Sequence, residues 1–145
     1  MNNVFTVRVE GRPAPQGSKS MHRGRMFETS KYVKPWRAAI AAAVKELTDG
    51  ETVFDRGRPL AVSVTFYVKR PRKPQHVPGL GQFPLPISTP DLDKLLRSTM
   101  DGMTESGVWA DDAQVVLFSD VSKVYATTSE PPGAEISVWE TAVFA

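Results

Sequence analysis

Alternating apolar and polar residues predict strands in several stretches of the chain. The clearest is residues 60–68, where every second residue is a large apolar one and the residues between are small or polar. This period of two places one face of a strand in a core. The same alternation predicts strands over residues 1–10 and 134–139. Residues 114–125 include four consecutive apolar residues, 115–118, which predict a strand in the middle of a sheet, buried on both faces.

Two other stretches have the 3.6-residue period of amphipathic helices. The first is residues 35–47, and we expect its apolar stripe in the core: Trp36, Ile40, Val44 and Leu47. Trp36 at this spacing is much more typical of a core residue than of one that stacks on a base. The second helix begins near Asp91, which can cap it together with Ser88 or Thr89, and Pro90 suits its first turn. Its stripe consists of Leu92, Leu95, Leu96, Thr99, Met100 and Met103.

These elements predict an α+β fold, a small mixed β-sheet with two main helices packed on it. A length of 145 residues fits one domain, which we expect to span residues 1–145. No apolar run approaches the length needed to cross a membrane, and no secretory signal is evident, so we expect no membrane partner and a cytoplasmic location. The exposed edges of such a small sheet favour a homodimer.

Charge is distributed unevenly along the chain. Residues 1–73 contain 15 lysines and arginines against 6 acidic residues, a net charge of +9, whereas residues 74–145 contain 3 against 10, a net charge of −7. A basic half of this kind suits an anionic polymer such as DNA. We expect a flap over residues 69–90, and the predicted DNA-contacting cations are Lys19, Arg23, Arg25, Lys69, Arg70, Arg72, Lys73 and Lys94. The alternative is ordinary segregation of surface charge.

Four aspartates lie in two pairs within residues 90–116. Asp91 and Asp93 begin the second helix, and Asp111 and Asp112 follow its end. Each pair alone is accounted for by capping or turn formation. Together, carboxylates this dense repel one another unless a cation lies between them, so the stretch predicts a metal site. The chain has no cysteine and two histidines, which leaves oxygen ligands and therefore Mg²⁺ or Mn²⁺.

This segment resembles the RusA family of Holliday junction resolvases, whose signature is a D-x-D helix start followed about twenty residues on by a Gly-hydrophobic-hydrophobic-x-Asp-Asp-x-Gln-hydrophobic run. The matching residues are Pro90, Asp91, Asp93, Leu95, Asp101, Gly107, Val108, Asp111, Asp112, Gln114 and Val115. The resemblance implies that Asp91, Asp93 and Asp112 are catalytic metal ligands with Asp111 as a neighbour. Where the family usually has asparagine and lysine, this chain has Lys94 and Arg97. Arg97 keeps the positive charge but changes its shape, and the resemblance implies that it takes the family lysine's catalytic role at the phosphate.

The resemblance further implies a magnesium-dependent endodeoxyribonuclease. Its expected role is to resolve four-way junctions by paired nicks in DNA recombination and repair, as a homodimer, in a bacterial host cell with a phage or prophage origin. Two alternatives stay open. One is a non-catalytic protein that binds branched DNA and uses its aspartates for capping and turns. The other is a small metal-dependent nucleotide phosphohydrolase, which the basic half of the chain disfavours because a small substrate needs few cations.

Overall fold

The computed structural model of the chain describes residues 4–17, 19–22, 25–28, 31–72, 78–79 and 85–142, with the backbone alone described for 19–22 and 25–28. Its elements follow in the order β1 (Val4–Glu10), β2 (Lys19–His22), β3 (Arg25–Glu28), α1 (Val33–Thr48), β4 (Leu60–Val68), α2 (Leu92–Ser106), the short 3₁₀ helix η1 (Asp112–Gln114), β5 (Val115–Tyr125) and β6 (Gly133–Glu140).

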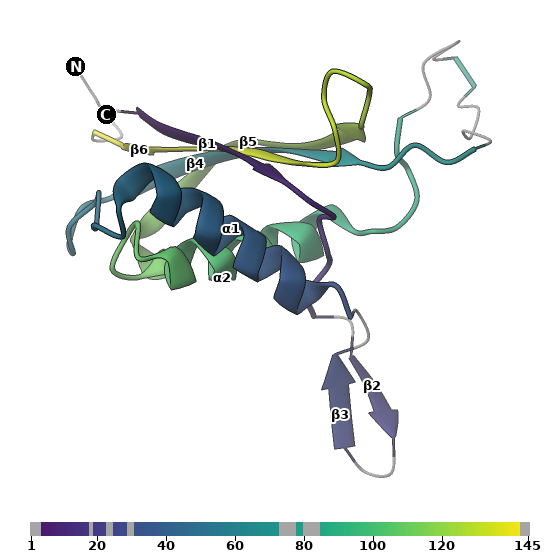
Figure 1. Cartoon of the computed structure of the whole chain (residues 1–145), viewed down its shortest axis with the longest axis horizontal. Coiled ribbons are helices and arrows are strands. Elements are labelled where there is room, and N and C mark those ends of the chain that lie inside the picture. The colour runs from purple at the N-terminus through teal and green to yellow at the C-terminus, as the bar shows by residue number, and fades with distance from the viewer. Residues whose placement is uncertain are drawn as a thin grey trace.

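Four strands form one mixed sheet in the order β1-β6-β4-β5. β6 runs antiparallel to both of its neighbours, β1 and β4, whereas β4 and β5 are parallel and are connected through α2. The two helices pack against each other and cover one face of this sheet (Figure 1). The predicted α+β fold, a small mixed sheet with two helices packed on it, is confirmed.

The prediction that the strand near residues 114–125 is central is wrong. β5 lies at an edge of the sheet, and β6 and β4 are the inner strands. The apolar run at the start of β5 misled the prediction, because two of its members, Val116 and Phe118, are 53% and 46% exposed. These two side chains therefore form an apolar surface along an unpaired edge.

The second sheet is the hairpin of β2 and β3, in which Lys19 pairs with Glu28 and His22 with Arg25. It extends away from the main body, beyond the start of α1 (Figure 1). Two of the cations predicted to contact DNA, Lys19 and Arg25, therefore lie on the backbone of a hairpin that extends from the main body.

The core between the helices and the sheet confirms three of the four residues predicted for α1. Trp36, Ile40 and Val44 are buried, but Leu47 is 61% exposed. Leu47 has the right helical phase and lies in the last turn of α1, beyond the packed layer, so hydrophobic period alone could not show its exposure. Within the described residues, neither helix is long and apolar enough to cross a membrane.

Gly102 of α2 packs closely against Ile40 of α1. A Cβ atom added there would lie 3.0 Å from both Cβ and Cδ1 of Ile40. We expect Gly102→Ala to lower the free energy of unfolding by about 1–2 kcal/mol, because overpacking outweighs the gain in helix propensity. Urea unfolding would measure this. In an Ile40→Ala background the same change should cost less, and equal costs in the two backgrounds would contradict a steric conflict with Ile40.

Candidate functional site

The first pair of aspartates lies at the start of α2. Asp91 is the N-cap residue and Asp93 is in the first turn; both are exposed. Contrary to expectation, the Asp91 side chain makes no capping hydrogen bond and Pro90 precedes the helix. The Asp91 carboxylate instead lies 3.4 Å from the ammonium group of Lys94. The carboxylates are therefore open to solvent, and Lys94, predicted to contact DNA, pairs with one of them.

β5 holds the segment that leads into α2. The Lys123 ammonium group donates hydrogen bonds to the carbonyl oxygens of Ser88 and Pro90, at 2.7 and 2.8 Å. The position of Asp91 thus depends on a side chain from the edge strand. Sequence reasoning missed Lys123, because it is an isolated lysine in a strand and its partners are backbone atoms.

The chain just before β2 runs along the exposed side of α2. The backbone N–H of Gln16 donates to the carbonyl of Lys94 at 3.0 Å, and the Gln16 side chain donates to Asp101 Oδ2 at 2.6 Å. Gly17 lies against Arg97, since a Cβ atom at this glycine would be 2.6 Å from the guanidinium group. A side chain larger than that of glycine at position 17 would therefore displace the Arg97 guanidinium group.

The second pair of aspartates lies in the turn between α2 and β5, and its two members differ. The Asp111 carboxylate caps η1 by accepting from the N–H of Ala113 at 3.0 Å, which lowers its pKa. Partial desolvation raises the pKa of the Asp112 carboxyl, and the hydrogen bond and charge of Asp111 and the charge of Asp101 add to the shift. The Asp111 carboxylate is thus bonded within the turn, whereas the pKa of Asp112 is influenced by the negative charge of Asp101 on α2.

Gln114 completes this turn. Its side-chain oxygen accepts hydrogen bonds from the N–H groups of Ala110 and Asp111, at 2.9 and 3.0 Å, which together with Asp111 forms a capping box. Its side-chain nitrogen donates to the carbonyls of Asp55 and Arg58, at 2.9 and 3.1 Å. Gln114 therefore anchors the turn that contains Asp112 to the loop before β4.

The motif aspartates form two acidic groups, Asp91 and Asp93 at the start of α2 and Asp111 and Asp112 in the turn after its end. The 15 residues of α2 that separate them correspond to about 22 Å of helical rise. Among the residues that the structure describes, no three histidine, aspartate or glutamate side chains are close enough to hold a metal ion. The donors present are carboxylate oxygens, which fit Mg²⁺ or Mn²⁺. One chain thus supplies suitable ligands in two separate groups.

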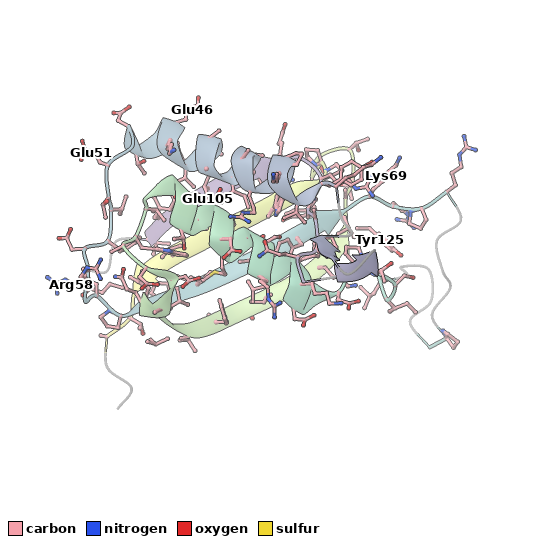
Figure 2. The ribbon with its side chains drawn as sticks, turned by 90° about the horizontal axis from the view of Figure 1, so that it is seen from below. Glu46, Glu51, Arg58, Lys69, Glu105 and Tyr125 are labelled. Atoms are coloured by element: carbon pink, nitrogen blue, oxygen red, sulfur yellow. The ribbon has the colours of Figure 1, made fainter. Side chains whose placement is uncertain are left out.

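The predicted DNA-contacting cations are partly described. Lys69, Arg70 and Arg72 are exposed just after β4, and Figure 2 shows Lys69 and Tyr125 at the end of the molecule opposite Glu51 and Arg58. Lys19 and Arg25 lie on the β2–β3 hairpin. Arg23 and Lys73 fall outside the described residues.

Two further cations, Arg12 and Lys31, were missed by sequence reasoning. Their charged groups lie 3.8 and 5.3 Å from the ring centre of Tyr32. The signal for Arg12 was the basic, proline-rich stretch that follows β1, whereas Lys31 lies after β3 and outside that stretch.

Comparison with known families gives one finding that spans this site. The model of a family described as Endodeoxyribonuclease RusA matches residues 10–139, which include both aspartate pairs, the hairpin and all predicted DNA-contacting cations. A search of curated proteins finds no match.

Proposed function

The chain belongs to the RusA family of endodeoxyribonucleases, which act on Holliday junctions, and from this premise we propose that it cuts four-way junctions in a metal-dependent reaction during recombination and repair. We propose Mg²⁺ as the metal, with Mn²⁺ as a substitute. The observation that carries the proposal is the placement of Asp91, Asp93 and Asp112. All three motif carboxylates are exposed to solvent on α2 or at the turn into the edge strand.

We further propose that a homodimer assembles the metal site. β5 is an edge strand, and exposed apolar residues lie on it and on the segment before α2: Val116, Phe118, Leu85 and Ile87. A two-fold axis beside this edge would place two β5 strands antiparallel, as isologous dimers allow. The start of one β5, next to Asp112, would then lie near the end of the other, which is bonded through Lys123 to the segment before Asp91.

In such a dimer each metal would be held by Asp91 and Asp93 of one copy and Asp112 of the second copy. When bound, a divalent ion polarises the scissile phosphate and stabilises the charge that develops on it. Arg97, on the same helix face as Asp93, neutralises charge on the phosphoryl oxygens. The hairpin and the cations after β4 contact the phosphate backbone, which positions the DNA without reading much sequence.

A gel assay tests this function. A labelled four-way junction, a flap and a plain duplex are incubated with the protein in Mg²⁺ or in EDTA, and strand products are separated under denaturing conditions. We expect nicks in the junction with Mg²⁺ and none with EDTA. Junction binding without nicks at any Mg²⁺ or Mn²⁺ concentration would instead select a non-catalytic binding protein. Hydrolysis of free nucleotides, without salt-sensitive DNA binding, would select a phosphohydrolase.

Gly17→Ala tests the placement of Arg97. The added methyl group would displace the guanidinium group, which lies 2.6 Å from the new Cβ position. We expect nicking of the junction to fall about tenfold, an effect equivalent to about 1.4 kcal/mol in the transition state. Single-turnover rates with saturating protein would measure the change.

Gly57→Ala is the matched control for that variant. Gly57 also has a positive φ, 88° against 103° for Gly17, but nothing lies within 4 Å of its added Cβ. Both variants carry similar backbone strain. If the contact with Arg97 and not this strain slows nicking in Gly17→Ala, then Gly57→Ala should nick at a rate close to that of the parent. Equal rates for the two variants would refute the role of the glycine contact.

A further inference from the structure

A cavity of about 910 Å³ lies between the start of α1, the end of β4 and the segment that leads into α2. Its wall includes Pro90, the residue before Asp91, so the cavity adjoins one of the two acidic groups. Six prolines line it, and prolines lack the backbone N–H groups that could bond a ligand. Recognition in this cavity therefore falls largely to its charged and aromatic side chains.

The charged side chains of the cavity are all positive. Arg12, Lys31 and Lys69 line it, and no acidic residue is among the described residues of its wall. None of the ion pairs found in the described part of the chain involves these three cations. Three uncompensated cations around one hollow attract an anion, and phosphate is the anion that arginine and lysine both bind well.

The aromatic side chains add flat surfaces. Tyr32 and Tyr125 line the cavity, and the Arg12 guanidinium lies over the Tyr32 ring at 3.8 Å from its centre. Outside the wall, Arg70 lies 5.7 Å from the ring centre of Tyr125. Tyrosine rings and guanidinium planes are the surfaces on which proteins stack unpaired bases. A hollow that combines them with cations suits a ligand that has both a planar base and a phosphate.

We propose that this cavity holds one unpaired nucleotide of the branched DNA, next to the phosphate that is cut. The base stacks on the Arg12–Tyr32 pair, and Lys31 and Lys69 contact the flanking phosphates. The volume lies within the range of small-ligand sites. This inference rests on the proposed function and adds that substrate choice depends on a nucleotide able to leave the duplex, which is easiest where pairing is already interrupted.

The test uses the full chain and four-way junctions in which a single nucleotide near the mapped cut is replaced by an abasic residue, one position at a time. This change removes the base and keeps the phosphate. Binding is measured by fluorescence anisotropy in Ca²⁺, and nicking of the intact junction is measured in parallel in Mg²⁺. With the parent protein we expect one abasic position to weaken binding about tenfold, within the range for loss of one stacked base.

Two tyrosine variants make the test specific. In Tyr32→Leu, that abasic position should have less than a twofold effect, because the stacking surface is already gone. Tyr67→Leu is the matched control, since Tyr67 also packs against an arginine, with Arg8 at 4.4 Å from its ring centre, but lies outside the cavity. It should keep the full tenfold effect. Circular dichroism confirms that both variants are folded.

The inference is overturned if no abasic position weakens binding of the parent protein, or if Tyr32→Leu stays as sensitive as the parent. Either result with normal nicking in Mg²⁺ leaves the proposed function intact, because the nicking assay reports cutting whether or not a base occupies this cavity. Absence of nicking on every junction is the separate result that overturns the proposed function.

Discussion

Two inactive variants, Asp91→Asn and Asp112→Asn, are expected to restore junction nicking when they are co-expressed. Each variant alone should lose about a thousandfold in rate, because loss of a metal ligand removes several kcal/mol of transition-state stabilisation and each 1.4 kcal/mol is a factor of ten. Both should still bind the junction, since the cations proposed to contact DNA are unchanged in these variants.

The recovery follows from the separation of the two acidic groups along α2. In a mixed dimer with shared sites, one site carries both substitutions and the other carries neither. If the two variants pair at random, about half of the dimers are mixed, and each mixed dimer has one complete site out of two. About a quarter of the sites in the mixture should therefore be active, compared with all sites in the parent. A mixed dimer should nick one strand without separating the arms, which denaturing and native gels distinguish.

Controls distinguish shared sites from a nonspecific recovery of activity on mixing. Asp91→Asn combined with an Asp91→Asn, Asp112→Asn double variant should stay inactive, because no complete site can form. Asp120→Asn, an exposed aspartate on β5 outside the motif, should keep the parent's activity. If the mixture of single variants also stays inactive while its mixed dimers are shown to form, the carboxylates do not act across two copies.

Trp36→Ala is expected to lower the free energy of unfolding by about 3–5 kcal/mol, the cost of removing a large buried aromatic side chain. Trp36 is 1% exposed, and its indole N–H donates to the hydroxyl of Thr99 on α2 at 3.1 Å. The loss is a large fraction of the stability of a typical domain. Urea unfolding followed by circular dichroism measures it without relying on tryptophan fluorescence.

Thr99→Val separates packing from hydrogen bonding at the same place. It keeps the shape of the side chain and leaves the indole N–H without its partner, which should cost about 1–3 kcal/mol. A Trp36→Ala variant with nearly parental stability but weakened junction binding would contradict the core assignment and would favour Trp36 as a base-stacking residue.

The helices and strands could be predicted from the sequence because the apolar residues of each recur with the short period typical of that element. The alternation at residues 60–68 predicts a strand with the bounds that β4 has, and the helix stripe from Leu92 to Met103 lies on the inner face of α2. Strand order could not be predicted this way. An apolar run such as that of β5 shows that side chains are apolar, but not whether another strand, a second copy or solvent lies beside them.

The residues of the candidate site could be proposed from the sequence, but their geometry could not. Spacing identified the two aspartate pairs, but a motif does not show that the length of α2 separates Asp91 from Asp112. The motif also could not show that Asp111 and Asp112 have different roles in the turn. That difference arises because Asp111 caps η1, a helix of three residues that the sequence does not specify. The cavity was beyond prediction, since its walls come from segments far apart in the chain.

The amide of Gln114 is saturated: its oxygen accepts twice, and its nitrogen uses both hydrogens. A carboxylate at this position could serve the two N–H groups but would face the carbonyl oxygens of Asp55 and Arg58 with no hydrogen to offer. A leucine would leave all four backbone groups to find water. Glutamine is thus the side chain that can both accept from the two N–H groups and donate to the two carbonyl oxygens. This pairing accounts for an uncharged residue shortly after the two aspartates of the motif.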